Sequence, residues 1–220
     1  GPMAVDWQQI VFFLSVASMG LGAVGAIGQT NIKRLLAYSS IANIGFALVG
    51  LAAATPQGIE ALLFYTAVYL AMTLGCFMVV LQLRRADGAA VELISDLSGL
   101  SKVRPGLAAA MAIFMFSLAG IPPLLGFWPK FAVFQAAIGA GLIPLAIIGF
   151  LASVVAAFYY LRLVKVMYFD EPGVAVVSDG GITNGAMIAA AALFCSPVGM
   201  LAITPIVGAA GRASAALFLR

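Results

Sequence analysis

Long apolar runs separated by short polar stretches dominate this sequence. A helix needs about 20 mostly apolar residues to cross a hydrocarbon core of about 30 Å. Six runs meet that length, and they cover residues 8–30, 35–54, 58–83, 106–139, 142–169 and 182–206. Because every backbone polar group in a bilayer needs an internal partner, spanning segments of this kind fold as helices. We therefore predict an all-α integral membrane protein with about six transmembrane helices, forming a single transmembrane region over residues 1–220.

The composition excludes a water-soluble fold and most cofactor sites. Of the 220 residues, 64% are hydrophobic and 9% are charged, and the mean hydropathy is +1.13; soluble domains carry about 25% charged residues. The chain has no histidine, which removes the commonest metal ligand. Cys76 and Cys195 lie within apolar runs, where a cysteine usually packs as a small hydrophobic residue. We expect this chain to hold no metal and no cofactor, and the net charge of +3 is too small to indicate a nucleic-acid partner.

Basic residues mark one side of the membrane. Eight of the eleven Lys and Arg residues fall in the first connection, in the third connection or at the end of the fifth run, namely Lys33, Arg34, Arg84, Arg85, Lys102, Arg104, Arg162 and Lys165. The intervening connections, 54–58 and 136–141, contain none. The positive-inside rule makes the basic side cytoplasmic. Both ends of this chain are therefore predicted on the outer side.

The fourth apolar run is too long for one plain span and contains a cluster of helix-breaking residues. These are Gly120, Pro122, Pro123 and Gly126. Each proline removes a backbone donor and cannot continue a helix. We predict two half-helices, 106–119 and 124–139, joined by an unwound connector over 120–126. Such a break at membrane depth is tolerated only where protein or water satisfies the freed backbone groups.

Lys130 is the only charged residue between Gly106 and Leu142. A charge inside the bilayer costs at least about 2.5–3.5 kcal/mol, so a lysine there is by default a functional candidate. Desolvation disfavours its charged form, which suits a group that binds and releases a proton. The alternative is a lysine that extends to the outer interface with its charge in water. The adjacent helix break favours the first interpretation, and we predict that Lys130 is a proton-relay residue.

Several polar side chains in the second and third runs are candidates to line a hydrated path to that lysine. They are Ser39, Ser40, Asn43, Tyr65 and Tyr69. Small and hydroxyl-bearing residues also let membrane helices pack closely, and this structural role is equally open. Near the end of the fifth run, Phe158, Tyr159 and Tyr160 precede basic residues. That pattern predicts an aromatic belt at the membrane interface.

Two segments also resemble a known family. Gly28–Gly45 and Ser117–Phe131 are similar to the signatures of the antiporter-like membrane subunits of respiratory NADH–quinone oxidoreductase, complex I. Asn31 stands where the sister subunits L and M tend to have Asp, and Lys130 stands where M tends to have Glu. By these two positions the chain looks most like subunit N. Two departures are Asn43, where members often have His, and Pro129, where a small residue is more usual.

The resemblance implies a fold of fourteen membrane helices, of which this chain would be the C-terminal part. It implies a translocase subunit that couples NADH oxidation and quinone reduction elsewhere to outward proton pumping. Lys130 would be the terminal lysine of a half-channel that opens outward, and its relay partners would lie upstream of Gly1. NADH, FMN, iron–sulfur clusters and quinone are then expected on other subunits. The implied partners are the bilayer and neighbouring antiporter-like subunits in a bacterial inner membrane, with both ends of the chain periplasmic.

Two other functions stay open from the sequence. One is a subunit of a multi-subunit cation/proton antiporter, which shares the ancestral fold and exchanges Na⁺ for H⁺ without redox partners. The other is an assembly scaffold for neighbouring subunits, in which the titratable groups carry no protons.

Overall fold

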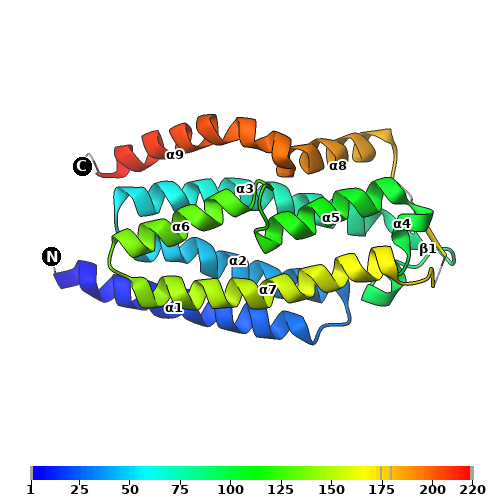
Figure 1. Ribbon diagram of the computed structural model, residues 1–220, viewed down its shortest axis with the longest axis horizontal. Helices are drawn as coiled ribbons and strands as arrows, with labels where there is room; N and C mark the ends of the chain where they lie inside the picture. The colour runs from blue at the N-terminus through cyan, green and yellow to red at the C-terminus, as the bar shows by residue number, and fades with distance from the viewer. Residues whose placement is uncertain (1, 174, 179, 219–220) are drawn as a thin grey trace.

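The computed structural model describes residues 2–173, 175–178 and 180–218. In that part of the chain, long helices run side by side along one axis (Figure 1). The long helices are α1 (Pro2–Ile27), α2 (Ile32–Ala52), α3 (Pro56–Gln82), α5 (Pro105–Ala119), α6 (Phe127–Gly139), α7 (Ile143–Phe169), α8 (Ile182–Cys195) and α9 (Ile203–Phe218). The short elements are β1 (Leu83–Arg85), η1 (Ile94–Leu97), α4 (Leu100–Val103), β2 (Val176–Ser178) and η2 (Pro197–Ala202).

The helices are arranged in three layers around a buried apolar core (Figure 1). Helices α1, α2 and α7 form one side of the bundle, and α3, α5 and α6 lie in the middle. Helices α8 and α9 pack on the other side, both against α3. The core therefore lies between α2, α3, α5, α6 and α7, which places residues of all five helices next to one another.

The predicted fold class is confirmed, and one run differs from its expected range. Five helical segments are long and apolar enough to cross a membrane. Helix α5 ends at Ala119 as predicted, while α6 begins at Phe127, three residues after the predicted start at 124. The run expected over 182–206 is instead α8, η2 and α9, and it extends to Phe218. The interruption arises because Pro197 cannot donate a helical hydrogen bond, while the Ser196 hydroxyl caps η2 by accepting from the N–H of Val198 (3.2 Å).

Side-chain caps fix where two of the core helices begin. The Asn31 side chain accepts hydrogen bonds from the backbone N–H groups of Lys33 (3.0 Å) and Arg34 (3.1 Å) at the start of α2. Thr55 does the same for α3 by accepting from Gly58 N–H at 3.0 Å. Each cap satisfies donors that the first helical turn leaves without partners.

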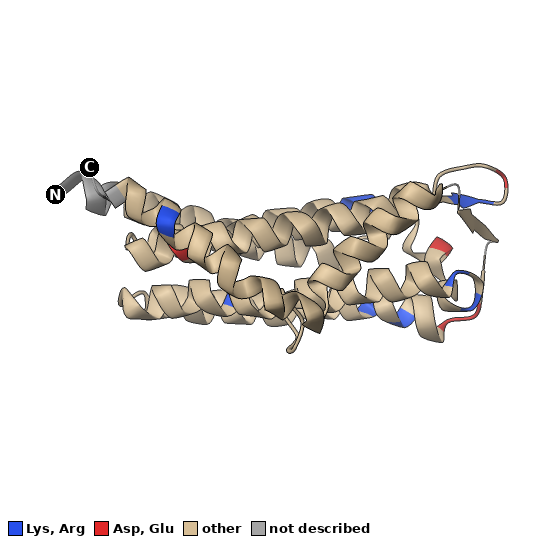
Figure 2. Ribbon diagram, turned by 90° about the horizontal axis from the view of Figure 1, so that it is seen from above, with Lys and Arg blue, Asp and Glu red and all other residues tan. Residues whose placement is uncertain are grey.

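Charged residues gather at one end of the bundle, where β1 pairs with β2 in antiparallel register (Figure 2). Ion pairs at this end join Lys33 to Glu92 (3.6 Å), Lys102 to Glu171 (2.7 Å) and Lys165 to Asp170. The long middle of the bundle is almost free of charge among the described residues (Figure 2). This distribution agrees with the basic side expected from the sequence.

Candidate functional site

The break between α5 and α6 begins with a glycine in the left-handed conformation. Gly120 has φ +81°, a region that glycine adopts without the strain of a side chain. Its N–H donates to the carbonyls of Phe116 (3.1 Å) and Ser117 (3.0 Å), and the N–H of Ile121 also donates to Phe116 (3.1 Å). These bonds end α5 with a left-handed cap.

The connector then returns to α5 through Gly126. The N–H of Gly126 donates to the hydroxyl oxygen of Ser117 at 2.9 Å, and a Cβ at this position would overlap the Ser117 backbone. The N–H of Leu125 donates to the carbonyl of Cys195 at the end of α8 (3.2 Å). Protein groups therefore satisfy the unwound backbone, as a break inside a membrane requires.

Lys130, one turn into α6, points back to the end of α5. Only 6% of Lys130 is exposed. Its Nζ donates to the carbonyl oxygens of Leu118 (3.0 Å) and Ala119 (3.4 Å) and to the Ser153 hydroxyl (3.1 Å). The two carbonyls belong to the last turn of α5, which has no following turn to supply N–H donors. The alternative of a lysine extended to the outer interface is therefore wrong, because the broken helix itself provides the acceptors.

Opposing effects act on the charge of Lys130. The C-terminal end of a helix carries a partial negative charge that stabilises a nearby cation. The Phe46 ring adds a cation–π contact, with its centroid 4.7 Å from Nζ. Burial in an apolar core disfavours the same charge. The site thus combines a desolvated amine with fixed dipoles that favour its protonated form.

A second buried network lies around Asn43 of α2. Its amide nitrogen donates to the Ser39 carbonyl (2.8 Å), the Ser39 hydroxyl (3.3 Å) and the Tyr160 hydroxyl (3.0 Å). Its amide oxygen accepts from the Tyr65 hydroxyl at 2.8 Å. The hydroxyls of Ser39 and Tyr160 also lie 2.5 Å apart. We call this cluster the Asn43 network; it consists of Asn43, Ser39, Tyr65 and Tyr160.

Helices α2 and α7 connect the Asn43 network to Lys130. Ser153 and Tyr160 are seven residues apart on α7, which places them on one face about 10 Å from each other at 1.5 Å per residue. On α2, Phe46 follows Asn43 by about one turn and touches the lysine. The two polar sites are therefore about two helical turns apart, with the Phe46 ring (1% exposed) on the side of Lys130.

The structure brings some predicted residues together and leaves others apart. Ser39, Asn43 and Tyr65 share one network. Ser40 instead donates to the Leu36 carbonyl of its own helix (3.0 Å). Tyr69 stacks on the Tyr65 ring, with centroids 6.4 Å apart, and takes no part in the hydrogen bonds of Asn43.

Three residues of these two sites were not predicted from the sequence, namely Ser153, Tyr160 and Phe46. The predicted aromatic belt is wrong for Tyr159 and Tyr160, which are at most 1% exposed, while Phe158 is 56% exposed. The sequence signal that could have linked Ser153 and Tyr160 is their spacing of seven residues, because residues two turns apart share a helix face. Nothing in the sequence said that this face meets Lys130 and Asn43.

Comparison with known proteins identifies the fold and the family. The family model described as "NADH:quinone oxidoreductase/Mrp antiporter, TM" matches residues 2–156. A protein of Sphingopyxis alaskensis named NADH-quinone oxidoreductase subunit N is 58% identical over 219 residues, covering 99% of this chain and 46% of the relative. A subunit N of Erythrobacter litoralis is 50% identical and is covered to 45%. The chain therefore spans about half the length of the curated relatives it matches.

Solved structures agree. A chain of respiratory complex I from Thermus thermophilus, with bound aureothin, is 31% identical with a TM-score of 0.75; the match covers 85% of this chain and 42% of that one. A chain of the Mrp complex from Dietzia is 23% identical with a TM-score of 0.81, over 96% of this chain and 47% of the other, and it shows a shared fold alone. With its broken helix, its buried lysine and these matches, the chain belongs to the NADH:quinone oxidoreductase/Mrp antiporter transmembrane family.

Proposed function

We propose that this chain is the C-terminal half of subunit N of an NADH–quinone oxidoreductase and that it carries protons through the membrane. Electron transfer from NADH to quinone would take place on other subunits, which would also hold FMN, the iron–sulfur clusters and the quinone. The neighbouring antiporter-like subunits would be its partners in a bacterial inner membrane. Both ends of the chain would be periplasmic, in line with the charges at one end of the bundle (Figure 2).

Lys130 is the residue on which the proposal rests. The amine is buried and still makes three hydrogen bonds as a donor. In its protonated form it binds the Leu118 and Ala119 carbonyls and Ser153. On release of the proton the neutral amine loses its attraction to the negative end of the α5 dipole, keeps two N–H donors for the carbonyls and gains a lone pair that can accept from the Ser153 hydroxyl. A change of charge at Lys130 is thereby coupled to the geometry of the helix break.

Only the hydroxyl groups of the Asn43 network would pass on a proton. Tyr65, Tyr160 and Ser39 bear hydroxyls that can both donate and accept. The Asn43 amide cannot take up and release a proton as histidine does, so it would orient the hydroxyls and hold water. The supporting role of Ser40 and Tyr69 would be limited to packing.

The test is substitution of Lys130 in the complete complex, with protons moved per electron measured in membrane vesicles. Lys130→Ala removes the titratable group, and Lys130→Arg keeps a positive charge that cannot be released in a protein. We expect both variants to assemble and oxidise NADH with a lowered proton-to-electron ratio. A wild-type ratio in Lys130→Arg would show that only the charge matters, and a wild-type ratio in Lys130→Ala would refute the proposal.

The likeness in fold to the Mrp chain supports a second candidate, a subunit of a cation/proton antiporter. Vesicles without NADH separate the two functions. Sodium-driven proton movement that depends on Lys130 would favour the antiporter. A scaffold would instead show assembly defects with normal coupling in whatever complex forms.

A further inference from the structure

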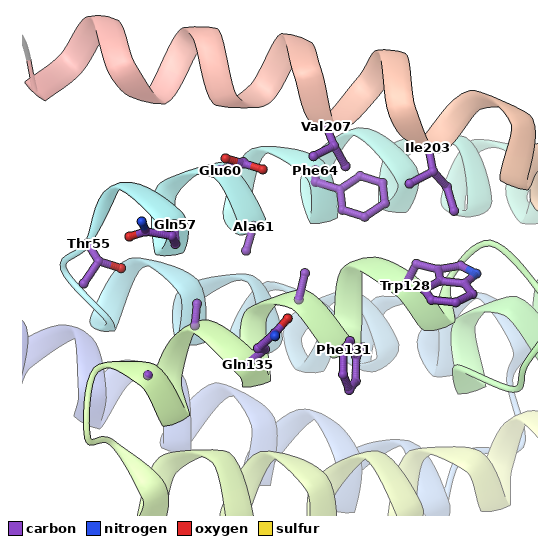
Figure 3. Close-up of a pocket in the computed structure, with 13 residues that line it drawn as sticks. Thr55, Gln57, Glu60, Ala61, Phe64, Trp128, Phe131, Gln135, Ile203 and Val207 are labelled. Carbon is purple, nitrogen blue, oxygen red and sulfur yellow. The ribbon is translucent and has the colours of Figure 1, made fainter.

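A groove of about 660 Å³ lies between α3, α6 and α9 (Figure 3). Its lining divides into two parts. Thr55, Gln57, Glu60 and Gln135 supply polar groups toward one end, while Phe64, Trp128, Phe131, Ile203 and Val207 supply apolar surface toward the other (Figure 3). The volume is in the range of about 300–1,000 Å³ that small-molecule sites occupy. Such a groove fits an elongated amphiphile.

The length of the groove matches one leaflet of a bilayer. On α6 it extends from Gly139, at the end of the helix, to Trp128. Eleven residues at 1.5 Å each cover about 16 Å, which is half of a hydrocarbon core of about 30 Å. The polar end lies at the helix termini and the apolar end near the middle of the bundle. A lipid of the leaflet on the side of Thr55 would therefore fit with its headgroup at the polar end.

The groove opens sideways along one face of α6. Phe131 is 51% exposed, and Gln135 is also exposed. These residues are one turn apart, so they form the mouth of the groove along the helix. An acyl chain can enter the groove through this mouth.

One charged residue, Glu60, lines the polar end, and one basic residue, Arg212, lies outside the lining on α9. Glu60 lies on α3, and a Cβ placed on Gly211 would be 3.1 Å from its Oε2, so the α9 backbone passes close to the carboxylate. Arg212 extends along α9 to Gly208, where its Nη1 would be 3.7 Å from an added Cβ. Neither charge is in the four ion pairs among the described residues. The Glu60 carboxylate complements the ammonium of a zwitterionic headgroup, and the Arg212 guanidinium, which follows Gly211 on α9, complements its phosphate.

The groove is separate from the lysine site. Every hydrogen-bond partner of Lys130 lies on α5 or α7, and its ring contact is on α2. The groove lies on the α3 and α9 side of α6. Because the body of α6 stands between them, the groove is poorly placed as an outlet for a proton from Lys130.

We propose that this groove binds a phospholipid with a primary ammonium headgroup, from the leaflet on the side of Thr55. Glu60 binds the ammonium, Arg212 lies beside the phosphate, and one acyl chain fills the apolar part between Phe64 and Val207. The site does not depend on proton transport by Lys130.

The test uses the complete complex in nanodiscs that contain equal amounts of phosphatidylethanolamine, phosphatidylcholine and phosphatidylglycerol. Lipid that stays bound after mild detergent washing is identified by mass spectrometry. We expect retained phosphatidylethanolamine. Glu60→Gln, which keeps the shape, should lower its retention about tenfold, the factor that corresponds to 1.4 kcal/mol. Val207→Trp fills the apolar part and should abolish retention of every lipid, while Leu217→Trp on the exposed side of α9 is the matched control.

Four results would overturn the proposal. Equal retention by wild type and Glu60→Gln would remove the headgroup assignment, and so would a preference for phosphatidylglycerol. A lowered proton-to-electron ratio in Glu60→Gln with unchanged lipid would make the groove a water path. A cross-link from Gln135→Cys to another subunit would show that protein covers it. Lys130→Ala should keep the lipid, so failure of the proton proposal is measured independently.

Discussion

Replacement of Gly126 by alanine tests whether the geometry of the helix break controls the lysine site. An added Cβ would lie 2.7 Å from the Ser117 carbonyl carbon and 2.8 Å from its hydroxyl oxygen, and closer still to its carbonyl oxygen. The connector must then move, and the bond from Gly126 N–H to that hydroxyl (2.9 Å) is lost. Overpacking costs about 1–3 kcal/mol and the lost bond about 0.5–1.5 kcal/mol. The expected destabilisation is about 2–4 kcal/mol.

The same shift should displace Lys130, which lies one helical turn after Gly126. A misplacement of about 1 Å can slow a positioned reaction about 100-fold. We expect Gly126→Ala to inactivate at lower temperature than wild type and to move fewer protons per electron. Gly139→Ala is the matched control, since it lies at the other end of α6 and an added Cβ there meets nothing within 4 Å. Identical thermal inactivation and coupling in the two variants would refute the reasoning.

Three further substitutions test single contacts in the assembled complex. Ser153→Ala removes a hydrogen bond to a charged group, worth about 1.5–3 kcal/mol, and should slow proton transfer measured in vesicles. Ser40→Ala is its control and should not slow it. Equal proton-transfer rates in the two variants would contradict the role of Ser153. Tyr65→Phe leaves a buried amide oxygen without its donor and should cost about 1–3 kcal/mol of stability, seen as faster thermal inactivation. Tyr69→Phe is its control, and a matching loss there would argue against the network. Asn31→Ala should cost about 1 kcal/mol through loss of the helix cap, and Asn31→Asp should restore it; no difference between these two would mean that the cap is unimportant.

The helices and the break were predictable because they depend on local chemistry. Runs of apolar residues leave a segment only the helix as a way to satisfy its backbone in lipid. Pro122, Pro123 and the flanking glycines ended α5 at the predicted residue, and α6 began at Phe127, three residues after its predicted start at 124. The last run was harder to predict, because Pro197 interrupts its helix while the apolar residues continue. Hydropathy alone does not show where one helical hydrogen bond is missing.

The importance of Lys130 could also be inferred from the sequence, but its partners could not. A single charge in an apolar run is visible in any sequence. Its acceptors are twelve and eleven residues earlier in the chain, and Ser153 is 23 residues later. The Tyr160 contact with Ser39 joins residues 121 positions apart. Helical periodicity gives the face on which a residue lies, and it does not give the helix that packs against that face.

The sequence by itself therefore determined a helical membrane protein, a break in one helix and a buried lysine beside it, because each follows from the cost of bare backbone or charge in hydrocarbon. Tertiary structure decided what the lysine binds, that Tyr160 is internal rather than interfacial, and that a two-part groove lies on the far side of α6. The reason is that these features are made by contacts between helices. Such contacts depend on how whole helix faces pack together, which no local pattern in the chain specifies.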